Sequence, residues 1–150
     1  ETPVVRMVAK KSHISMISAI TNGGKVRFMM YRDAMNSKLL IKFMTRLTKD
    51  AGRKVFLILD NLRVHHGKEV KKWLEDHRDQ IEVFHLPSYS PELNPDEYLN
   101  GNLKNRVHSG VPIRSQGDLE KKTRSFMRTL IRHPEHVQSY FKHPKVAYAA

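Results

Sequence analysis

The sequence predicts a single α/β domain in which helices flank a mixed β-sheet. Three observations support this fold class: a hairpin signal near the start, a strand–helix–strand pattern in the middle, and helical periodicity through the remainder. The length of 150 residues is typical of one domain and sufficient for a buried core. Since no repeat or linker divides the chain, we expect residues 1–150 to fold as one unit.

The first three elements are short apolar segments at residues 4–9, 14–21 and 25–32. The second and third are separated by Asn22-Gly23-Gly24, and Asn-Gly and Gly-Gly are strong hairpin signals. We therefore expect these two segments to pair as antiparallel strands.

The middle of the chain predicts a helix followed by a β-α-β unit. Residues 35–52 have apolar side chains at helical spacing and a stop signal at Gly52. Residues 54–60 form a continuous apolar run, which is typical of a strand buried on both faces. A helix over 68–79 and a strand over 81–87 follow. Such crossovers join neighbouring parallel strands, so the ends of 54–60 and 81–87 should lie side by side.

The last third predicts helices over 95–108 and 115–133 and a short one within 134–144. The expected buried positions of the two longer helices are Leu99, Leu103, Val107, Leu119, Phe126, Leu130 and Ile131. Gly101 lies in the middle of the first of these helices, where glycine costs about 1 kcal/mol relative to alanine. Close approach of another element or a ligand would explain it.

The charge balance points to a polyanionic partner. Lys and Arg number 27 against 15 Asp and Glu, a net charge of +12, which favours nucleic acid, although a merely soluble basic protein stays open. The absence of Cys excludes disulfides, thiolate zinc sites and cysteine nucleophiles, and fits a reducing cytosol. No apolar run approaches the roughly 20 residues of a membrane span.

Two carboxylates are the main candidates for chemistry. Asp60 ends a buried strand, where ligands gather in open α/β sheets, although it could simply accept bonds from loop amides. Glu97 follows Asn94, Pro95 and Asp96, a pattern that also suits a helix start with a capping box. If the loop returns Glu97 to the strand ends, the pair would suit Mg²⁺ or Mn²⁺ in a two-metal site for phosphoryl transfer. We expect Asp96 to be structural and Glu97 to bind the metal.

Other polar residues allow weaker hypotheses. His65, His66 and Glu69 suggest zinc, but adjacent histidines rarely bind one ion, so we place His65 at the edge of a cleft. Asp33 is expected to cap the helix that follows it. Candidate DNA-binding residues are His65, Asn100, Lys104, Lys121, Lys122, Arg124 and Arg128. A solvated charged face is the alternative for the basic residues.

Two motifs resemble those of the DDE-superfamily transposases, in the mariner-like branch of bacterial insertion sequences. They are LILDNLRVHHGKEVKKWL, followed by VFHLPSYSPELNPDEYLNGNLK, with 36 residues between Asp60 and Glu97. The resemblance extends to ISMISAI upstream and to the last 26 residues. It implies an RNase H-like fold and metal-dependent DNA strand cleavage and strand transfer at transposon ends.

The resemblance also assigns roles to residues. Asp60 matches the second acid of a catalytic triad and Glu97 the third; Asn61, His65, Pro91, Asn94 and Pro95 match the surrounding motifs. The first Asp belongs on the first strand, which we expect to precede Glu1. The expected molecule is therefore a truncated catalytic domain that lacks its first strand and is inactive alone, although its parent cuts DNA.

The resemblance implies partners as well: transposon-end and target DNA, a possible homodimer, no membrane, and a bacterial cytoplasm near the nucleoid. Two other functions stay open. One is an RNase H-like nuclease or resolvase using the same metals, and the other is a non-catalytic remnant that only binds DNA.

Overall fold

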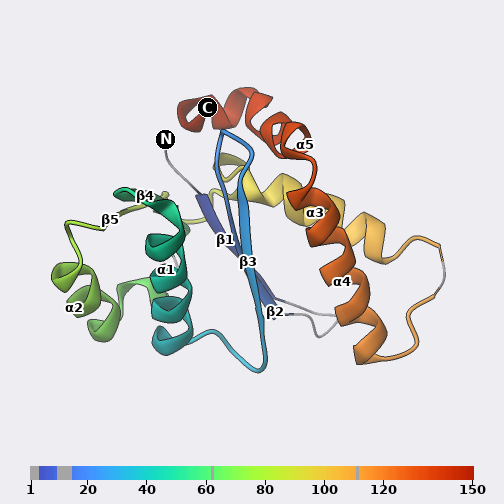
Figure 1. Cartoon of the computed structure of the whole chain (residues 1–150), viewed down its shortest axis with the longest axis horizontal. Helices are drawn as coiled ribbons and strands as arrows, with labels where there is room; N and C mark the ends of the chain where they lie inside the picture. The colour runs from blue at the N-terminus through green and yellow to red at the C-terminus, as the bar shows by residue number, and fades with distance from the viewer. Residues whose placement is uncertain (1–3, 10–14, 62, 111) are drawn as a thin grey trace.

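The computed structural model describes residues 4–9, 15–61, 63–110 and 112–150, with only the backbone described for 4–9, 63 and 64. A twisted five-stranded sheet forms its centre, in the order β3-β2-β1-β4-β5. Figure 1 shows helices α1 and α2 on one side of this sheet and α3, α4 and α5 on the other. The strands are β1 (Val4–Ala9), β2 (Ser15–Ile20), β3 (Val26–Tyr31), β4 (Val55–Leu59) and β5 (Ile81–His85).

The predicted hairpin is confirmed. β2 and β3 pair antiparallel, from Ser15 opposite Tyr31 to Ile20 opposite Val26. Gly24, at the turn, has a φ of +100°, and a Cβ added there would lie 2.7 Å from the Cβ of Pro134. Glycine is therefore required at position 24 for two reasons: the backbone conformation of the turn and the close approach of α5.

The predicted β-α-β unit is also confirmed. β4 and β5 pair in parallel, with Leu59 opposite His85, and the N–H of Leu86 donates to the carbonyl of Leu59 (2.8 Å). Helix α2 (Lys68–Asp76) connects them and buries Val70. The carboxyl ends of β4 and β5 consequently lie side by side at one edge of the sheet. Asp60 is the residue that directly follows β4 there.

The expectation of a missing first strand is corrected. β1 lies between β2 and β4, antiparallel to the first and parallel to the second. Unpaired strands expose backbone N–H and C=O groups, and this Val-rich segment pairs with both neighbours. β1 contains no Asp or Glu. The sheet thus has a strand at the expected place, but that strand carries no acid.

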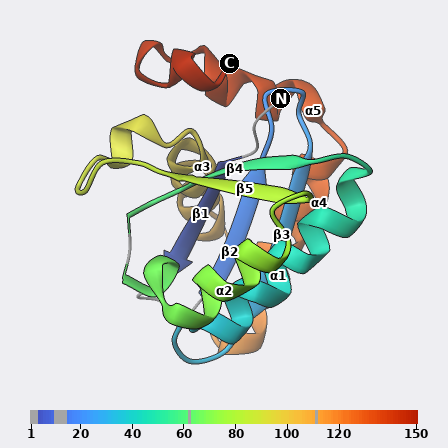
Figure 2. The same cartoon turned by 90° about the vertical axis from the view of Figure 1, so that its left-hand side faces the viewer.

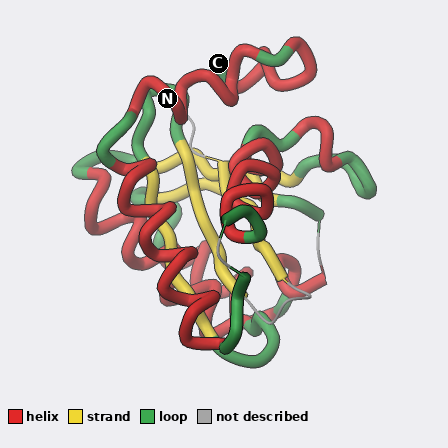
Figure 3. The backbone as a smooth tube through the Cα atoms, turned by 90° about the vertical axis from the view of Figure 1, so that its right-hand side faces the viewer, coloured by secondary structure: helices red, strands yellow, loops and turns green. Residues whose placement is uncertain are grey.

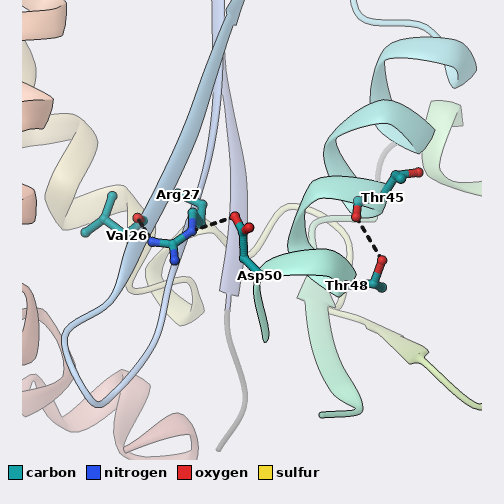
Figure 4. A network of polar contacts seen from close by, with 5 residues as sticks. All are labelled: Val26, Arg27, Thr45, Thr48 and Asp50. Carbon is teal, nitrogen blue, oxygen red and sulfur yellow. Dashed lines mark hydrogen bonds and ion pairs between the residues drawn. The ribbon is translucent and has the colours of Figure 1, made fainter. Parts of the chain in front are cut away.

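Helix α1 (Ser37–Ala51) begins one residue after its cap. The cap is Asn36, whose Oδ1 accepts from the N–H of Leu39 (2.8 Å), and not Asp33, which has a φ of +63°. The helix ends at Gly52, which has a φ of +68°, as predicted. Near this end Asp50 accepts from Arg27 of β3 (Nε to Oδ2, 3.0 Å; Figure 4), an exposed ion pair that contributes at most about 1 kcal/mol.

The C-terminal helices cover the opposite face of the sheet (Figure 3). They are α3 (Asp96–Val107), α4 (Gln116–Ile131) and α5 (Pro134–Ser139), followed by two short 3₁₀ helices over Tyr140–Lys142 and Pro144–Ala149. Figure 2 shows this last segment crossing one end of the sheet. Two further 3₁₀ turns cover Arg63–His66 and Pro91–Leu93.

Apolar side chains alternate between the two faces of the sheet, as a strand period of two requires. Met16 and Ile20 pack with α3, α4 and α5, whereas Ile17 and Ala19 pack with α1. The core therefore has two layers, one on each face of the sheet.

The buried face of α4 differs in part from the prediction. Leu119 and Leu130 are buried as expected, but Ile131 is 42% exposed. Thr123 and Met127 are fully buried instead, because α4 presents the positions i, i+4, i+8 and i+11 to the sheet. The hydroxyl of Thr123 donates to the carbonyl of Leu119 (2.8 Å), which allows a polar side chain at a buried position.

Candidate metal and nucleic-acid site

Asp60 and Glu97 are both connected to Asn94. Asn94 is fully buried, and its Nδ2 donates to Oδ1 of Asp60 (3.0 Å). Its main-chain carbonyl accepts from the N–H of Glu97 (3.0 Å), and its own N–H donates to the carbonyl of Pro91 (3.0 Å). We call Asp60, Asn94 and Glu97 the acid site.

The acid site is formed by a strand end and a helix start. Asp60 directly follows β4 and is half-buried. Helix α3 begins at Asp96, one residue later than predicted, and Oδ1 of Asn94 accepts from the N–H of Asp96 (3.0 Å). In place of a capping box, the Oε1 of Glu97 accepts from Nδ2 of Asn100 (3.3 Å). Glu97 is therefore oriented by its own helix.

The two adjacent acids have different environments. Asp96 is fully buried, and its Oδ2 accepts from the hydroxyl of Ser18 in β2 (2.6 Å). Glu97 is half-buried and reaches the surface. This difference supports the expectation that Asp96 holds α3 against the sheet and leaves Glu97 as the candidate ligand.

Three histidines lie close to Asp60. His65 is buried, with Nδ1 bonded to the main-chain carbonyl of Asp60, and burial lowers its pKa despite the nearby Asp60 charge. Nδ1 must carry the proton, so Nε2 is an acceptor that has no partner among the described residues. The His66 ring bonds to Asn61 and packs on His85, with centroids 4.2 Å apart. Burial and then the charge of His66 lower the pKa of His85.

The described side chains of these histidines are not arranged as zinc ligands are. Across the described ranges there is no group of three or more His, Cys, Asp and Glu side chains that could hold a metal ion. His66 and His85 pack ring against ring, whereas shared coordination would require their nitrogens to converge. His65 is placed beside Asp60 as expected, but it supports the backbone there and offers little surface.

Tyr148 makes a hydrogen bond near the acid site that was not predicted from the sequence. Its hydroxyl donates to the carbonyl of Leu93, in the loop that leads to Glu97. Burial and the negative charge of Asp60 raise the pKa of Tyr148. The C-terminal 3₁₀ helix therefore supports the acid site. No local pattern could reveal this, because 55 positions separate the two bonded residues.

The candidate DNA-binding residues fall into three groups. Lys104, Lys121, Arg124 and Arg128 are exposed. Lys122 is half-buried and donates to the carbonyl of Val107, the last residue of α3 (3.5 Å), and to that of Ser109 just beyond the helix (3.4 Å). His65 and Asn100 are only 3% and 4% exposed, and both side chains support the acid site from within; their contact with DNA stays a prediction.

The close approach expected at Gly101 is absent from the described residues. Gly101 is exposed, and a Cβ built there meets no atom within 4 Å. The Gly101→Ala substitution should therefore stabilise the fold by about 1 kcal/mol, since alanine is the better helix former. Thermal unfolding would check this, with Gly52→Ala as the contrast: Gly52 has a positive φ, so alanine there should destabilise. Destabilisation by Gly101→Ala would contradict the expectation.

The chemistry of the acid site fits Mg²⁺ or Mn²⁺ in part. Carboxylate oxygens are the ligands these ions prefer, and Asp60 and Glu97 supply two such groups. A third acid is missing from β1: Val4 pairs with Ile58, so Arg6 lies level with Asp60. The described residues therefore provide two of the three acids expected for such a site.

The sheet order, with a carboxylate after β4 and another at the start of α3, defines the RNase H-like class of α/β domains. The chain belongs to the DDE superfamily endonuclease family, whose model matches residues 1–120. It is also 31% identical over 100 residues to the "Insertion element IS630 uncharacterized 39 kDa protein" of Shigella sonnei. That match covers 65% of this chain and 29% of the relative, so the chain spans less than a third of that protein.

Solved structures agree with this fold. The catalytic domain of Mos1 mariner transposase matches with a TM-score of 0.68 and 15% identity, over 99% of this chain and 81% of that chain. The structure of Mos1 transposase catalytic domain and raltegravir with Mn matches with a TM-score of 0.67 and 16% identity, over 99% of this chain and 82% of that chain. The catalytic core domain of BIV integrase matches with a TM-score of 0.65 and 16% identity, over 96% of this chain and 97% of that chain. In the described part of this chain, no helix is both long and apolar enough to cross a membrane.

Proposed function

We propose that this chain is the catalytic portion of an insertion-sequence transposase that cleaves DNA at transposon ends and transfers the strands to a target. The observation that carries the proposal is the connection of Asp60 and Glu97 through Asn94. It joins two carboxylates that are far apart in the sequence at the end of β4. Membership of an endonuclease family supports the same reaction class.

Asp60 and Glu97 would hold Mg²⁺ or Mn²⁺, and the bound ions would stabilise negative charge on the attacked phosphate and activate the attacking oxygen. The neighbouring residues orient these two ligands. Asn94 holds one oxygen of Asp60 by donating to it, and Asn100 does the same for Glu97. His65 holds the main chain at Asp60. Such support keeps ligands in place before the substrate binds.

The chain alone should not cleave DNA, because β1 has Arg6 and no acid at the level of Asp60. We propose that the active species is a longer form of the protein, in which residues outside this chain supply the third acid. It would act on transposon ends and target DNA, as a dimer, in the cytoplasm near the nucleoid.

The test compares this chain with that longer form in a plasmid assay with a donor end and Mg²⁺. The longer form should insert the donor end, and Glu97→Gln should abolish insertion, whereas Glu92→Gln, an exposed acid in the same loop, should not. Nicks without insertion would instead indicate a nuclease or resolvase. Robust nicking by the 150 residues, lost in Asp60→Ala, would contradict the proposed inactivity of the chain.

The absence of an acid from β1 also keeps a second function open, a remnant that binds DNA without cutting it. Failure of both cleavage and insertion in the longer form would favour this function.

A further inference from the structure

We propose that a groove between α3 and α4 binds the sugar–phosphate backbone of DNA, away from the acid site. The groove has a volume of about 350 Å³. Its cationic and imidazole side chains are Arg106, Lys122, His133 and His136. We call it the α3–α4 groove; the proposal rests on the proposed function, because it assumes a DNA substrate.

The lining of the α3–α4 groove suits a phosphodiester. None of its lining residues is acidic. Ser125 and Thr129 add hydroxyl donors, and Phe126 adds an apolar surface. Phosphate oxygens accept bonds from Arg, Lys and hydroxyl groups, while a deoxyribose can pack against an apolar side chain. This combination matches one strand of a nucleic acid better than a free anion.

Several groove residues are already held in position. Lys122 donates to the carbonyl of Val107, the last residue of α3, and to that of Ser109 just beyond it, so it lies against the wall formed by the end of that helix. These bonds also reduce the negative charge that the helix end would present to a phosphate. His133 is held by its Nδ1, which donates to the carbonyl of Thr129 (2.8 Å). Little ordering is then required when a ligand binds.

The position of the groove relates it to the acid site. Glu97 lies at the start of α3 and Arg106 near its end, which at a rise of about 1.5 Å per residue separates them by roughly 14 Å along the helix. Nine residues also rotate an α-helix by about two and a half turns, so the two side chains project from opposite sides of α3. The groove would therefore hold a part of the DNA other than the phosphate at the acid site.

The basic residues of α4 do not all line the same cavity. Lys122 lines the α3–α4 groove, whereas Arg124 lines a different cavity together with Arg32 and Glu120. Lys121 and Arg128 line neither of these two cavities. Of the basic face of α4, only the side that carries Lys122 therefore faces the α3–α4 groove.

The first experiment measures binding of a short labelled DNA duplex in EDTA at several salt concentrations. Arg106→Gln should weaken binding roughly threefold to tenfold and lower the salt slope by about one. Arg78→Gln, an exposed arginine after α2 with the same charge change, should stay within about twofold. Unchanged binding by Arg106→Gln, or an equal loss in Arg78→Gln, would overturn the proposal.

The second experiment uses the absence of cysteine from the chain. Ser125→Cys places a single thiol in the groove, and Gln80→Cys places one on an exposed loop after α2. With DNA carrying a thiol tether on one phosphate, Ser125→Cys should cross-link at least about fivefold more, and added Arg106→Gln should reduce this yield. Equal yields would overturn the proposal. Because EDTA removes metal, failure of cleavage and failure of groove binding are measured separately.

Discussion

Replacing Asp96 by Ala is expected to lower the free energy of unfolding by about 2–3 kcal/mol, measured by urea denaturation. Asp96 is fully buried, and its carboxylate accepts from Ser18 at 2.6 Å. Removing it leaves the Ser18 hydroxyl, which is also fully buried, without this acceptor, and leaving a buried donor unsatisfied costs about 1–3 kcal/mol. A carboxylate in the first turn of α3 also stabilises the helix start.

Two controls make this prediction specific. Ser18→Ala in a double-mutant cycle with Asp96→Ala should show a coupling of about 1 kcal/mol or more, because the two side chains bond directly. Glu97→Gln changes the neighbouring acid, which is half-buried, and should alter stability by less than about 0.5 kcal/mol. Equal losses at positions 96 and 97 would contradict the structural role of Asp96.

Replacing either Asp60 by Asn or Glu97 by Gln is expected to weaken Mn²⁺ binding at least about tenfold. Each change removes one negative charge and one strong oxygen ligand from a site that has two. Binding of the unmodified chain should itself be weak, since two carboxylates without a third acid repel each other until an ion binds. The measurement is paramagnetic broadening of backbone NMR signals around Asn94 during Mn²⁺ titration.

The matched control is Glu92→Gln, which removes an exposed acid five residues before Glu97 and should keep the broadening unchanged. Broadening that persists in both Asp60→Asn and Glu97→Gln would place the metal elsewhere. An unmodified chain without site-specific broadening would favour the binding-only function.

Much of the fold was predictable from local patterns. The Asn22-Gly23-Gly24 turn, the apolar run before Asp60 and the stop at Gly52 all lie where the structure places a hairpin, a buried strand and a helix end. Two predictions about helices were wrong: the cap of α1 and the buried face of α4. Asp33 and Asn36 are both good caps, and the choice between them depends on where α1 begins. The buried face of α4 depends on its rotation against the sheet, which put Ile131 outside.

The candidate site was predictable only in part. Motif resemblance supported Asp60 and Glu97 as the acids. His65 and Asn100 were predicted to contact DNA from their positions after Asp60 and on the face of the helix, and both side chains are buried. Burial depends on which elements pack over a residue, and a single sequence does not show this. The exposed residue Arg106 was not selected, because its partner in the groove, Lys122, is 16 positions away.

The sequence by itself determined the helices and strands, because caps, turns and apolar periodicity act over a few residues. It also determined the net charge of +12 and the absence of an acid from residues 4–9. Only the tertiary structure decided which polar groups meet: Asn94 with Asp60 across 34 positions, and Ser18 with Asp96 across 78. Those contacts depend on how the sheet and α3 pack. Packing therefore makes one of two adjacent acids structural and leaves Glu97 available to a metal ion.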